Sequence, residues 1–424
     1  MIRSTLAALL TSLSVSTSAL AQDFVVQNAK VWTGTDAGTL DNTDLLVRDG
    51  EIAAIGDNLD VPNGLDVIDA SGRWLTPGII APFTRIGIVE VGAEDSTDDR
   101  SADLTMASAS LIAADGFNPA ATSVNVTRIE GVTRIIVAPT ISSHVIGGQG
   151  FVANTSGAAD SVTERNAFVF VDVGEAGAAV AGGSRPALWS KLRSAIEDAR
   201  TYPARYATHD AGDALKRPDA RAFGPAVRGQ QLILFRVSRA SDIMQVLALK
   251  QEMPQLRFAL VGAEEAWLVA DALVAADVPV IIDPFANLPG RFESLAATQE
   301  NAKRLIAAGV PTAFAFLDRY TELQARIALQ VAGNAVGNGV AHDDALRALT
   351  TVPAAIFGLE TLGSIAVGKS ADLVIWDGDP LEVMSAPDMI WIDGESQSMT
   401  SRQTELRDRY ITPSEDDLPV AYRR

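Results

Sequence analysis

Two patterns of hydrophobic and polar positions divide the chain. Near its start, residues 24–32 and the apolar runs on either side of Asp49-Gly50 predict strands, because Asp-Gly between β-prone runs is typical of a two-residue hairpin turn. Near its end, residues 368–376 and 389–393 also predict short strands. Neither group is large enough to be stable alone, so we expect the two ends of the chain to pair in one small β domain.

A different pattern begins at Pro77, where short apolar runs alternate with helical stretches. This alternation is typical of βα units around a parallel sheet. The predicted strands cover residues 85–91, 133–138, 167–172, 232–237, 257–261, 278–283 and 312–316. Helices are predicted from Asp242 to a stop before Pro254, and over residues 264–276, 301–308, 322–336 and 342–350.

The first 21 residues have the pattern of a secretory signal. Arg3 supplies a positive charge, a mostly apolar or small stretch follows, and Ala19-Leu20-Ala21 is a small-x-small cleavage site. We therefore expect cleavage after Ala21 and a periplasmic or secreted protein. No segment is long and apolar enough to predict a membrane span.

Composition narrows the range of partners and chemistries. The 424 residues are 47% hydrophobic and 21% charged, which is typical of a folded globular chain. The net charge of −19 would repel nucleic-acid phosphates, so no nucleic-acid partner is expected. The chain has no cysteine, which excludes disulfides, thiolate nucleophiles and thiolate metal sites.

Two segments carry a family resemblance. Residues 75–87 read Leu-Thr-Pro-Gly-Ile-Ile-Ala-Pro-Phe-Thr-Arg-Ile-Gly, and residues 368–374 read Gly-Lys-Ser-Ala-Asp-Leu-Val. With residues 49–56 and 345–365, they resemble the amidohydrolase superfamily, most closely its imidazolonepropionase-like branch. The resemblance covers nearly the whole mature chain. It implies a (β/α)8 TIM barrel at residues 77–358, a β-sandwich composed of residues 23–76 and 359–400, and a polar tail at 401–424.

The resemblance also implies a metal site, and this sequence departs from it. In the family, histidines on strands one, five and six, a carboxylated lysine or glutamate on strand four and an aspartate on strand eight surround the metal. The strand-one histidines correspond here to Phe83 and Arg85, the strand-five histidine to Arg236, and the strand-eight aspartate to Asp318. Residues 261–264, at strand six, contain no histidine either.

The histidine count extends this departure to the whole chain. Only His144, His209 and His342 are present, and none is expected at the end of a strand, where a barrel places its catalytic groups. We expect them to be exposed or to cap helices. A histidine-bound metal centre therefore cannot be assembled from this sequence, and no cofactor is expected.

Other residues remain for the barrel mouth. Arg85 and Arg236 are expected to fill the space of the lost cation and to pair with a carboxylate such as Asp318, either as a structural salt bridge or as a ligand site. Further pocket candidates are the carboxylates near predicted strand ends: Glu90, Asp172 and Asp283. Such oxygen ligands leave calcium or magnesium as an alternative. The glycine-rich residues 146–150 predict a tight loop near the mouth.

Three functional hypotheses follow from the resemblance and the lost ligands. The first is a pseudoenzyme related to hydrolases of non-peptide C–N bonds, which binds a small anionic or carbonyl-bearing ligand or stabilises a partner subunit. The second is an active hydrolase of amides or cyclic amides, in which Arg85 polarises a carbonyl and Asp318 is the general base. The third is an oligomer, either of this chain alone or with a metal-competent paralogue.

Overall fold

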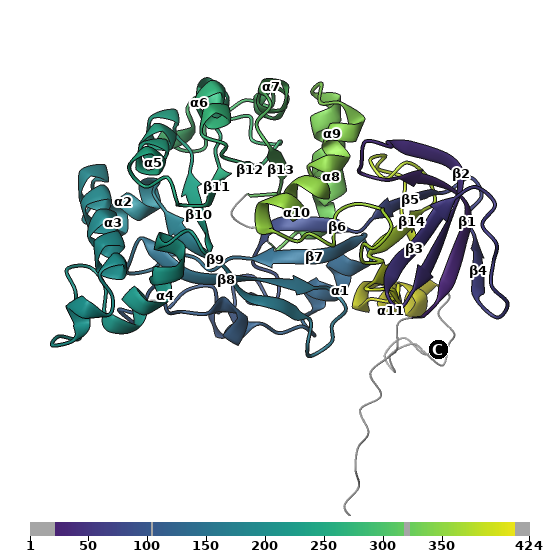
Figure 1. Ribbon diagram of the computed structural model, residues 1–424, viewed down its shortest axis with the longest axis horizontal. Helices are drawn as coiled ribbons and strands as arrows, with labels where there is room; N and C mark the ends of the chain where they lie inside the picture. Colours follow the sequence, from purple (N-terminus) through teal and green to yellow (C-terminus); the bar gives the residue numbers. More distant parts are fainter. Residues whose placement is uncertain (1–21, 103–104, 318–322, 412–424) are drawn as a thin grey trace, which may run out of the picture.

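Two sheets organise the molecule (Figure 1). The computed structural model describes residues 22–102, 105–317 and 323–411. One eight-stranded sheet curves into a barrel surrounded by helices, and the other forms a small domain at its side. The signal sequence predicted at residues 1–21 lies outside the described residues.

The barrel follows sequence order from its first strand to its last. Seven strands run parallel, whereas β8 pairs antiparallel with both β7 and β9. The predicted (β/α)8 architecture is therefore present, with one reversed strand that the sequence pattern did not indicate. The strands are β6 (Ile79–Thr84), β7 (Val132–Val137), β8 (Ile146–Asn154), β9 (Val162–Asp172), β10 (Leu232–Val237), β11 (Phe258–Gly262), β12 (Val280–Ile282) and β13 (Thr312–Phe314).

A short bridge lies between the first and last barrel strands. The backbone N–H of Ile80 on β6 donates to the carbonyl of Leu349 at 2.9 Å, and that of Phe314 on β13 donates to the neighbouring carbonyl of Ala348 at 3.0 Å. These two carbonyls follow helix α9. They accept the backbone hydrogen bonds that β6 and β13 would otherwise donate to a neighbouring strand.

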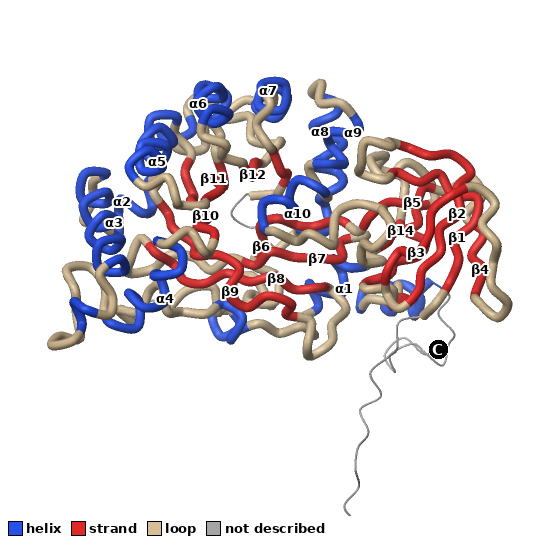
Figure 2. The backbone as a smooth tube through the Cα atoms, viewed as in Figure 1, coloured by secondary structure: helices blue, strands red, loops and turns tan. Residues whose placement is uncertain are grey.

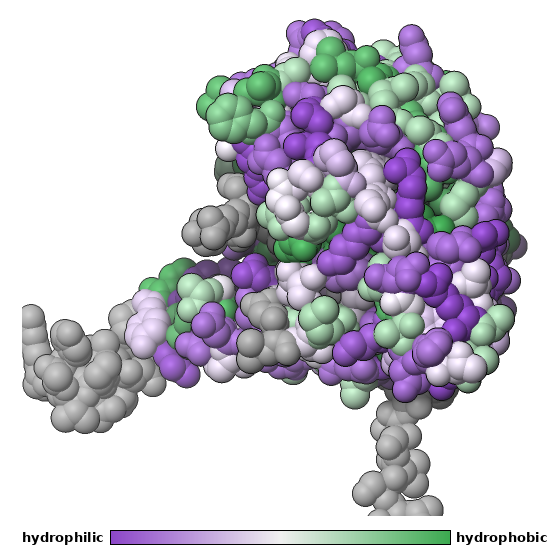
Figure 3. All heavy atoms as spheres, turned by 90° about the vertical axis from the view of Figure 1, so that its left-hand side faces the viewer, coloured by the Kyte–Doolittle hydropathy of each residue, from purple (hydrophilic) through white to green (hydrophobic). Residues whose placement is uncertain are grey.

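Helices cover the outside of the barrel (Figure 2). No helix within the described residues is long and apolar enough to cross a membrane. Hydrophilic side chains cover most of the face shown in Figure 3, and hydrophobic ones form separate groups on it. The helices are α1 (Thr122–Arg128), α2 (Glu175–Val180), α3 (Arg185–Arg200), α4 (Arg217–Val227), α5 (Ala240–Glu252), α6 (Ala270–Ala275), α7 (Asn301–Ala308), α8 (Ala328–Gly337), α9 (His342–Arg347), α10 (Thr351–Phe357) and α11 (Arg402–Ile411).

The small domain joins the two ends of the chain, as expected. Strand β14 (Leu373–Trp376) pairs antiparallel with β5 (Trp74–Pro77), so a C-terminal segment continues an N-terminal sheet. Asp49 and Gly50 both have positive φ angles, as the predicted hairpin turn requires. The remaining strands are β1 (Phe24–Trp32), β2 (Thr39–Arg48), β3 (Glu51–Gly56), β4 (Asp66–Asp69), β15 (Pro387–Ile392) and β16 (Glu395–Ser396).

A buried ion pair fastens the small domain to the barrel. Arg134 on β7 donates from Nε and Nη2 to the carboxylate of Asp372, over 2.6 and 2.8 Å. Its Nη2 also donates to Asp393 at 2.6 Å. The two carboxylates raise the pKa of Arg134 despite its burial, so its charge is retained. Asp372 belongs to the Gly-Lys-Ser-Ala-Asp segment that carried the family resemblance, which gives that segment a structural role.

Two predicted elements are wrong near the mouth. The strand predicted at 85–91 instead ends at Thr84, because the chain turns at Gly87, where φ is +82° and a side chain would meet the ring of Phe117. The glycine-rich residues 146–150 form the start of β8 and no loop. A Cβ at Gly150 would lie 2.0 Å from the ring of Phe168, so glycine lets that ring pack against the strand.

Candidate functional site at the barrel mouth

Strand alternation decides which side chains face the barrel lumen. Leu232 and Leu234 of β10 belong to the apolar cluster that fills the lumen, whereas Ile233 and Phe235 belong to the cluster that includes the surrounding helices. Successive side chains on a strand point to opposite sides. Arg236 therefore points into the lumen at the C-terminal end of β10.

The same alternation places Asp172 beside Arg236. On β9, Phe168 and Phe170 face the lumen, so Asp172 does so at the C-terminal end of the strand. Asp172 and Arg236 are register partners of the parallel pair β9–β10. The structure thus brings together a predicted strand-five residue and a carboxylate from strand four of the barrel.

Phe83 belongs to the apolar cluster that fills the barrel lumen. Its ring is 2% exposed and lies 6.0 Å from the ring of Phe170, centroid to centroid. The guanidinium carbon of Arg85 lies 5.5 Å from the centroid of the Phe83 ring, a cation–π contact. An apolar ring thus occupies one position where the family resemblance implies a metal-binding histidine, and a guanidinium lies beside it.

Arg85 is almost completely buried at the end of β6. Burial, together with the charges of Arg236 and Arg100, lowers its pKa to about 9, against the opposite effect of Asp98 and Asp172. A pKa of about 9 still leaves Arg85 protonated at neutral pH. The barrel mouth therefore contains a buried positive charge.

Asp172 is held in place by backbone groups. Its Oδ1 accepts hydrogen bonds from the N–H groups of Gly174 at 2.9 Å and Gly177 at 3.2 Å. Burial raises its pKa, while the charge of Arg236 and these two hydrogen bonds lower it. The carboxylate is thus a fixed partner for the arginines, since both backbone donors orient it.

Arg236 also lines a cavity of about 420 Å³ at the barrel mouth. Asp283 lines it and is satisfied by two backbone donors, Phe285 N–H at 2.9 Å and Leu317 N–H at 3.0 Å. Glu264 also lines it, and its buried Oε2 accepts no hydrogen bond from the described residues. Glu264 and Arg291, another lining residue, were not among the predicted site residues. The position of Glu264 just after the sixth barrel strand is a signal in the sequence that could have indicated it.

Charged residues also surround the cavity. Glu293 is 3% exposed, accepts a hydrogen bond from the N–H of Glu175 at 2.6 Å, and lies 3.6 Å from both Arg291 and Arg185. Burial is the main reason that its pKa is raised. Arg185 in turn donates to Asp242 at 2.7 Å. The ion pairs link the loop after β12 to α3 and α5, and the hydrogen bond from Glu175 links it to α2.

Several predicted residues lie elsewhere. Glu90 is exposed in the loop after β6 and accepts a hydrogen bond from Asn118 at 2.8 Å, away from the cavity lining. Glu90 was predicted at the mouth because a strand was expected over residues 85–91, and that strand ends instead at Thr84. Asp318 lies outside the described residues, so its pairing with Arg85 and Arg236 stays a prediction.

The histidines lie away from the mouth. His144 is buried, in contrast to the expected exposure, and its Nδ1 accepts a hydrogen bond from the N–H of Ile146 at 3.1 Å. His342 begins α9, where its Nε2 lies 2.9 Å from Asp379 on the side of the small domain. His209 is exposed. None of these rings lines the cavity at the mouth.

The residues at the mouth do not fit the metal centre that the resemblance implies. A phenyl ring and two guanidiniums stand where the resemblance implies metal ligands, and neither group donates an electron pair to a zinc-type metal. Within the described residues, no three histidine, aspartate or glutamate side chains are arranged to hold a metal ion. The chemistry of this mouth is that of fixed positive charges, oriented carboxylates and a partly apolar lining.

Comparison with known proteins gives the family. A sequence profile of the Amidohydrolase family matches residues 130–396. The chain is similar to the amidohydrolase tasK of Hapsidospora irregularis, at 26% identity over 432 residues, which cover 88% of this chain but 43% of that relative. A segment is 37% identical to the D-hydantoinase of Geobacillus stearothermophilus over 83 residues, or 20% of this chain and 17% of that enzyme. The matched segments therefore cover less than half of either relative.

Solved structures agree with this assignment. A crystal structure of an amidohydrolase from Thermotoga maritima MSB8 has a TM-score of 0.79 at 25% identity, over 88% of this chain and 99% of that chain. Molinate hydrolase shares the fold, with a TM-score of 0.58 at 15% identity over 94% of this chain and 98% of that one. By its sequence profile and its barrel with a second sheet drawn from both termini, this chain belongs to the amidohydrolase family.

Proposed function

We propose that this protein is an exported amidohydrolase-family pseudoenzyme that binds a small anionic or carbonyl-bearing ligand at the barrel mouth. The observation that carries the proposal is that Arg236 lines the cavity at the C-terminal end of strand five, while the buried Arg85 at the end of strand one is near enough for the charge of Arg236 to lower its pKa. Amidohydrolase barrels bind their ligands at this end by the general rule for TIM barrels. Membership of the family supports a ligand site at the C-terminal end of the barrel, and the two arginines favour an anionic or carbonyl-bearing ligand.

Charge and size support this ligand class. A guanidinium carries a permanent charge and a planar set of donors that match a carboxylate or carbonyl oxygen. The cavity of about 420 Å³ is in the size range of small-molecule sites. Phe285 and Leu317 provide apolar contacts in the same lining.

Metal content is the first test. The protein is purified without chelators, and its metals are measured by inductively coupled plasma mass spectrometry. We expect no stoichiometric zinc, iron or manganese, because the positions that would hold them carry Phe83, Arg85 and Arg236. One equivalent of any of these metals would overturn the proposal.

Ligand binding is the second test. Thermal unfolding is measured with a panel of N-acetyl amino acids, lactams and small dicarboxylates. A ligand at a hundred times its Kd adds about 2.7 kcal/mol to the free energy of unfolding. Arg236→Gln should abolish the shift, while Arg200→Gln, which changes an exposed arginine on α3, should preserve it. A shift of equal size in all three proteins would contradict binding at the mouth.

A second function keeps the hydrolytic activity of the family. In it, Arg85 polarises the carbonyl of an amide or cyclic amide and Asp318 acts as the general base. Release of product from N-acyl amino acids, lactams and dipeptides is followed with wild type and Asp318→Asn. Turnover that disappears in the variant supports this function, whereas turnover equal in both excludes Asp318 as the base.

A third function uses a partner subunit. The similarity to tasK covers most of this chain but only 43% of the relative, so the related polypeptide contains a further segment longer than this chain. We propose that this barrel associates with a second, metal-competent chain. Co-purification from the native source tests this function, and a species that contains only this chain would reject it.

Export is tested on the same material. The mature N-terminus is expected at Gln22, after cleavage at Ala21. N-terminal sequencing of protein from the periplasmic or extracellular fraction checks both the cleavage and the location. Intact Met1 on cytoplasmic protein would contradict export.

A further inference from the structure

A second cavity lies at the end of the barrel opposite to the mouth. Its volume is about 610 Å³, larger than the cavity at the mouth. Leu232, the first residue of β10, and Arg257, which precedes β11, line it, so it opens at the N-terminal ends of the strands. TIM barrels carry their catalytic groups at the other end. This cavity is therefore separate from the proposed function of the mouth.

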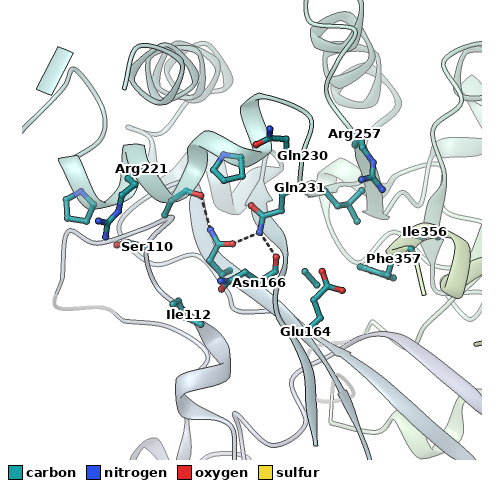
Figure 4. A pocket seen from close by; sticks show the side chains of 17 residues that line it. Ser110, Ile112, Glu164, Asn166, Arg221, Gln230, Gln231, Arg257, Ile356 and Phe357 are labelled. Carbon is teal, nitrogen blue, oxygen red and sulfur yellow. Dashed lines mark hydrogen bonds between the residues drawn. The ribbon is translucent and has the colours of Figure 1, made fainter. Parts of the chain in front are cut away.

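Helix α4 and the end of α10 form its walls (Figure 4). Pro218, Arg221, Ala222 and Pro225 line it from α4, at spacings of three and four residues that place them on one helical face. Because the other residues of this face are small or cyclic, Arg221 is its single long side chain. The opposite wall contains Ile356 and Phe357 of α10, which are mostly buried.

A chain of amides forms the floor (Figure 4). Gln231 donates from Nε2 to the Oε1 of Gln149 at 2.6 Å and to the backbone carbonyl of Asn166 at 2.7 Å. Gln149 is 4% exposed and donates to the carbonyl of Ala109 at 2.8 Å. Both hydrogens of the Gln231 amide are therefore used, which fixes the orientation of the amide. Its oxygen accepts no hydrogen bond from the described residues and remains available in the cavity.

The charges of the lining leave an excess of positive charge. Arg221 and Arg257 both line the cavity, and within the described residues neither lies within 4.0 Å of a carboxylate oxygen. Glu164 is the one carboxylate of the lining. Burial raises the pKa of Glu164, and the charge of Arg257 opposes this effect. Arg221 is thus the cation without a compensating carboxylate in the cavity.

We propose that this cavity is a second ligand site, for a small organic anion that has an apolar body and one N–H donor. The acidic group pairs with Arg221, the N–H donates to the oxygen of Gln231, and the apolar body packs on Ile356 and Phe357. Each contact uses a group that the protein itself leaves available. The class follows from a guanidinium, a fixed amide acceptor and an apolar wall in one cavity of ligand size.

The fluorescent probe 1-anilinonaphthalene-8-sulfonate tests this site directly. It has a sulfonate anion, an anilino N–H and an aromatic body, and its emission rises on binding. We expect saturable binding on the full-length mature protein that depends on Arg221. Arg221→Gln should weaken its binding by about tenfold or more, because a charge-assisted hydrogen bond is lost. Ala222→Phe should also abolish it, since the new ring fills the cavity.

Matched variants separate this site from other binding surfaces. Arg200→Gln removes an arginine of similar exposure outside the cavity and should leave the affinity unchanged. Arg236→Gln alters the cavity at the mouth and should also leave the affinity of the probe for this second cavity unchanged. A failure of the second site can therefore be distinguished from a failure of the proposed function. Phe292→Ser removes an exposed aromatic ring that could attract the probe.

The outcomes decide the proposal. Loss of binding in Arg221→Gln and Ala222→Phe, with retained circular dichroism and thermal unfolding, supports the site. Unchanged affinity in these two variants, or loss only in Phe292→Ser, overturns it. An absence of saturable binding to the wild type also overturns it.

Discussion

Arg236 and Asp172 lie opposite each other at the C-terminal ends of two neighbouring parallel strands, and both point into the barrel lumen. The charge of Arg236 lowers the pKa of Asp172, in opposition to the burial that raises it. Where the family resemblance implies a metal-binding histidine, the protein thus carries the cation of Arg236. That cation favours the ionised form of the buried carboxylate.

This relationship predicts an energetic coupling. Asp172→Asn retains an oxygen acceptor for Gly174 and Gly177 but removes the charge, whereas Arg236→Gln removes the opposing cation. We expect a coupling free energy of about 1–2 kcal/mol in a double-mutant cycle, because the effects of neighbouring, interacting charges are not additive. Urea unfolding of the four proteins measures it. Additive effects, within about 0.5 kcal/mol, would show that the two side chains do not interact.

Stability should depend on pH through His144. Burial lowers the pKa of His144 to about 4, and the positive charge of Lys191 contributes to this lowering, against the opposite effect of Asp219. Because the folded pKa lies below the unfolded value of about 6.5, the neutral ring stabilises the fold fully above pH 6.5. This stability is lost as pH falls from 6.5 towards 4, by about 3 kcal/mol in total at 1.36 kcal/mol for each pKa unit.

The variant His144→Asn isolates this effect. Its side-chain oxygen can still accept the hydrogen bond from Ile146, but it does not titrate. The difference in unfolding free energy between wild type and variant should therefore shrink between pH 7.5 and pH 4.5. With only three histidines in the chain, NMR titration can follow each ring separately. A His144 ring that titrates near pH 6.5 would contradict this interpretation.

Removal of Arg134 should loosen the attachment of the small domain. Arg134→Ala leaves Asp372 buried without its partner, and we expect a loss of about 3–5 kcal/mol in unfolding free energy. Arg73→Ala provides the comparison, since Arg73 and Asp388 form a partly exposed pair at 3.3 Å, for which a change below about 1 kcal/mol is expected. Equal effects of the two changes would argue against a special role for Arg134.

Gly150 should tolerate no side chain. Gly150→Ala would place a Cβ 2.0 Å from the ring of Phe168, and we expect destabilisation by about 2 kcal/mol or more from overpacking. Combination with Phe168→Leu should recover part of this loss. Gly337→Ala, at the end of α8 with no atom within 4 Å of the new Cβ, should be neutral or stabilising by up to about 1 kcal/mol. Thermal unfolding distinguishes the two glycines.

Local sequence determined much of the framework. The strand at 232–237 and the helix at 301–308 were predicted with the observed bounds, because a short apolar run and a C-terminal glycine are local signals. Helices α3 and α4 were not predicted. Strand β8 was also missed, since its glycines indicate a turn until the rings of Phe168 and Phe170 are known to lie against them.

The residues of the candidate site also divide into those that the sequence predicted and those that only the structure revealed. The sequence by itself predicted, through its family resemblance, that Phe83, Arg85 and Arg236 stand where the family has histidines, because that follows from which residue occupies each motif position. Only the tertiary structure decided that Asp172 and Glu264 accompany them and that Glu90 does not. Residues on different strands meet through register and strand alternation, and these depend on pairings between segments tens of residues apart. The alternation of residues along a strand predicts whether each side chain points inward or outward. It does not predict which residue of another strand lies beside that side chain.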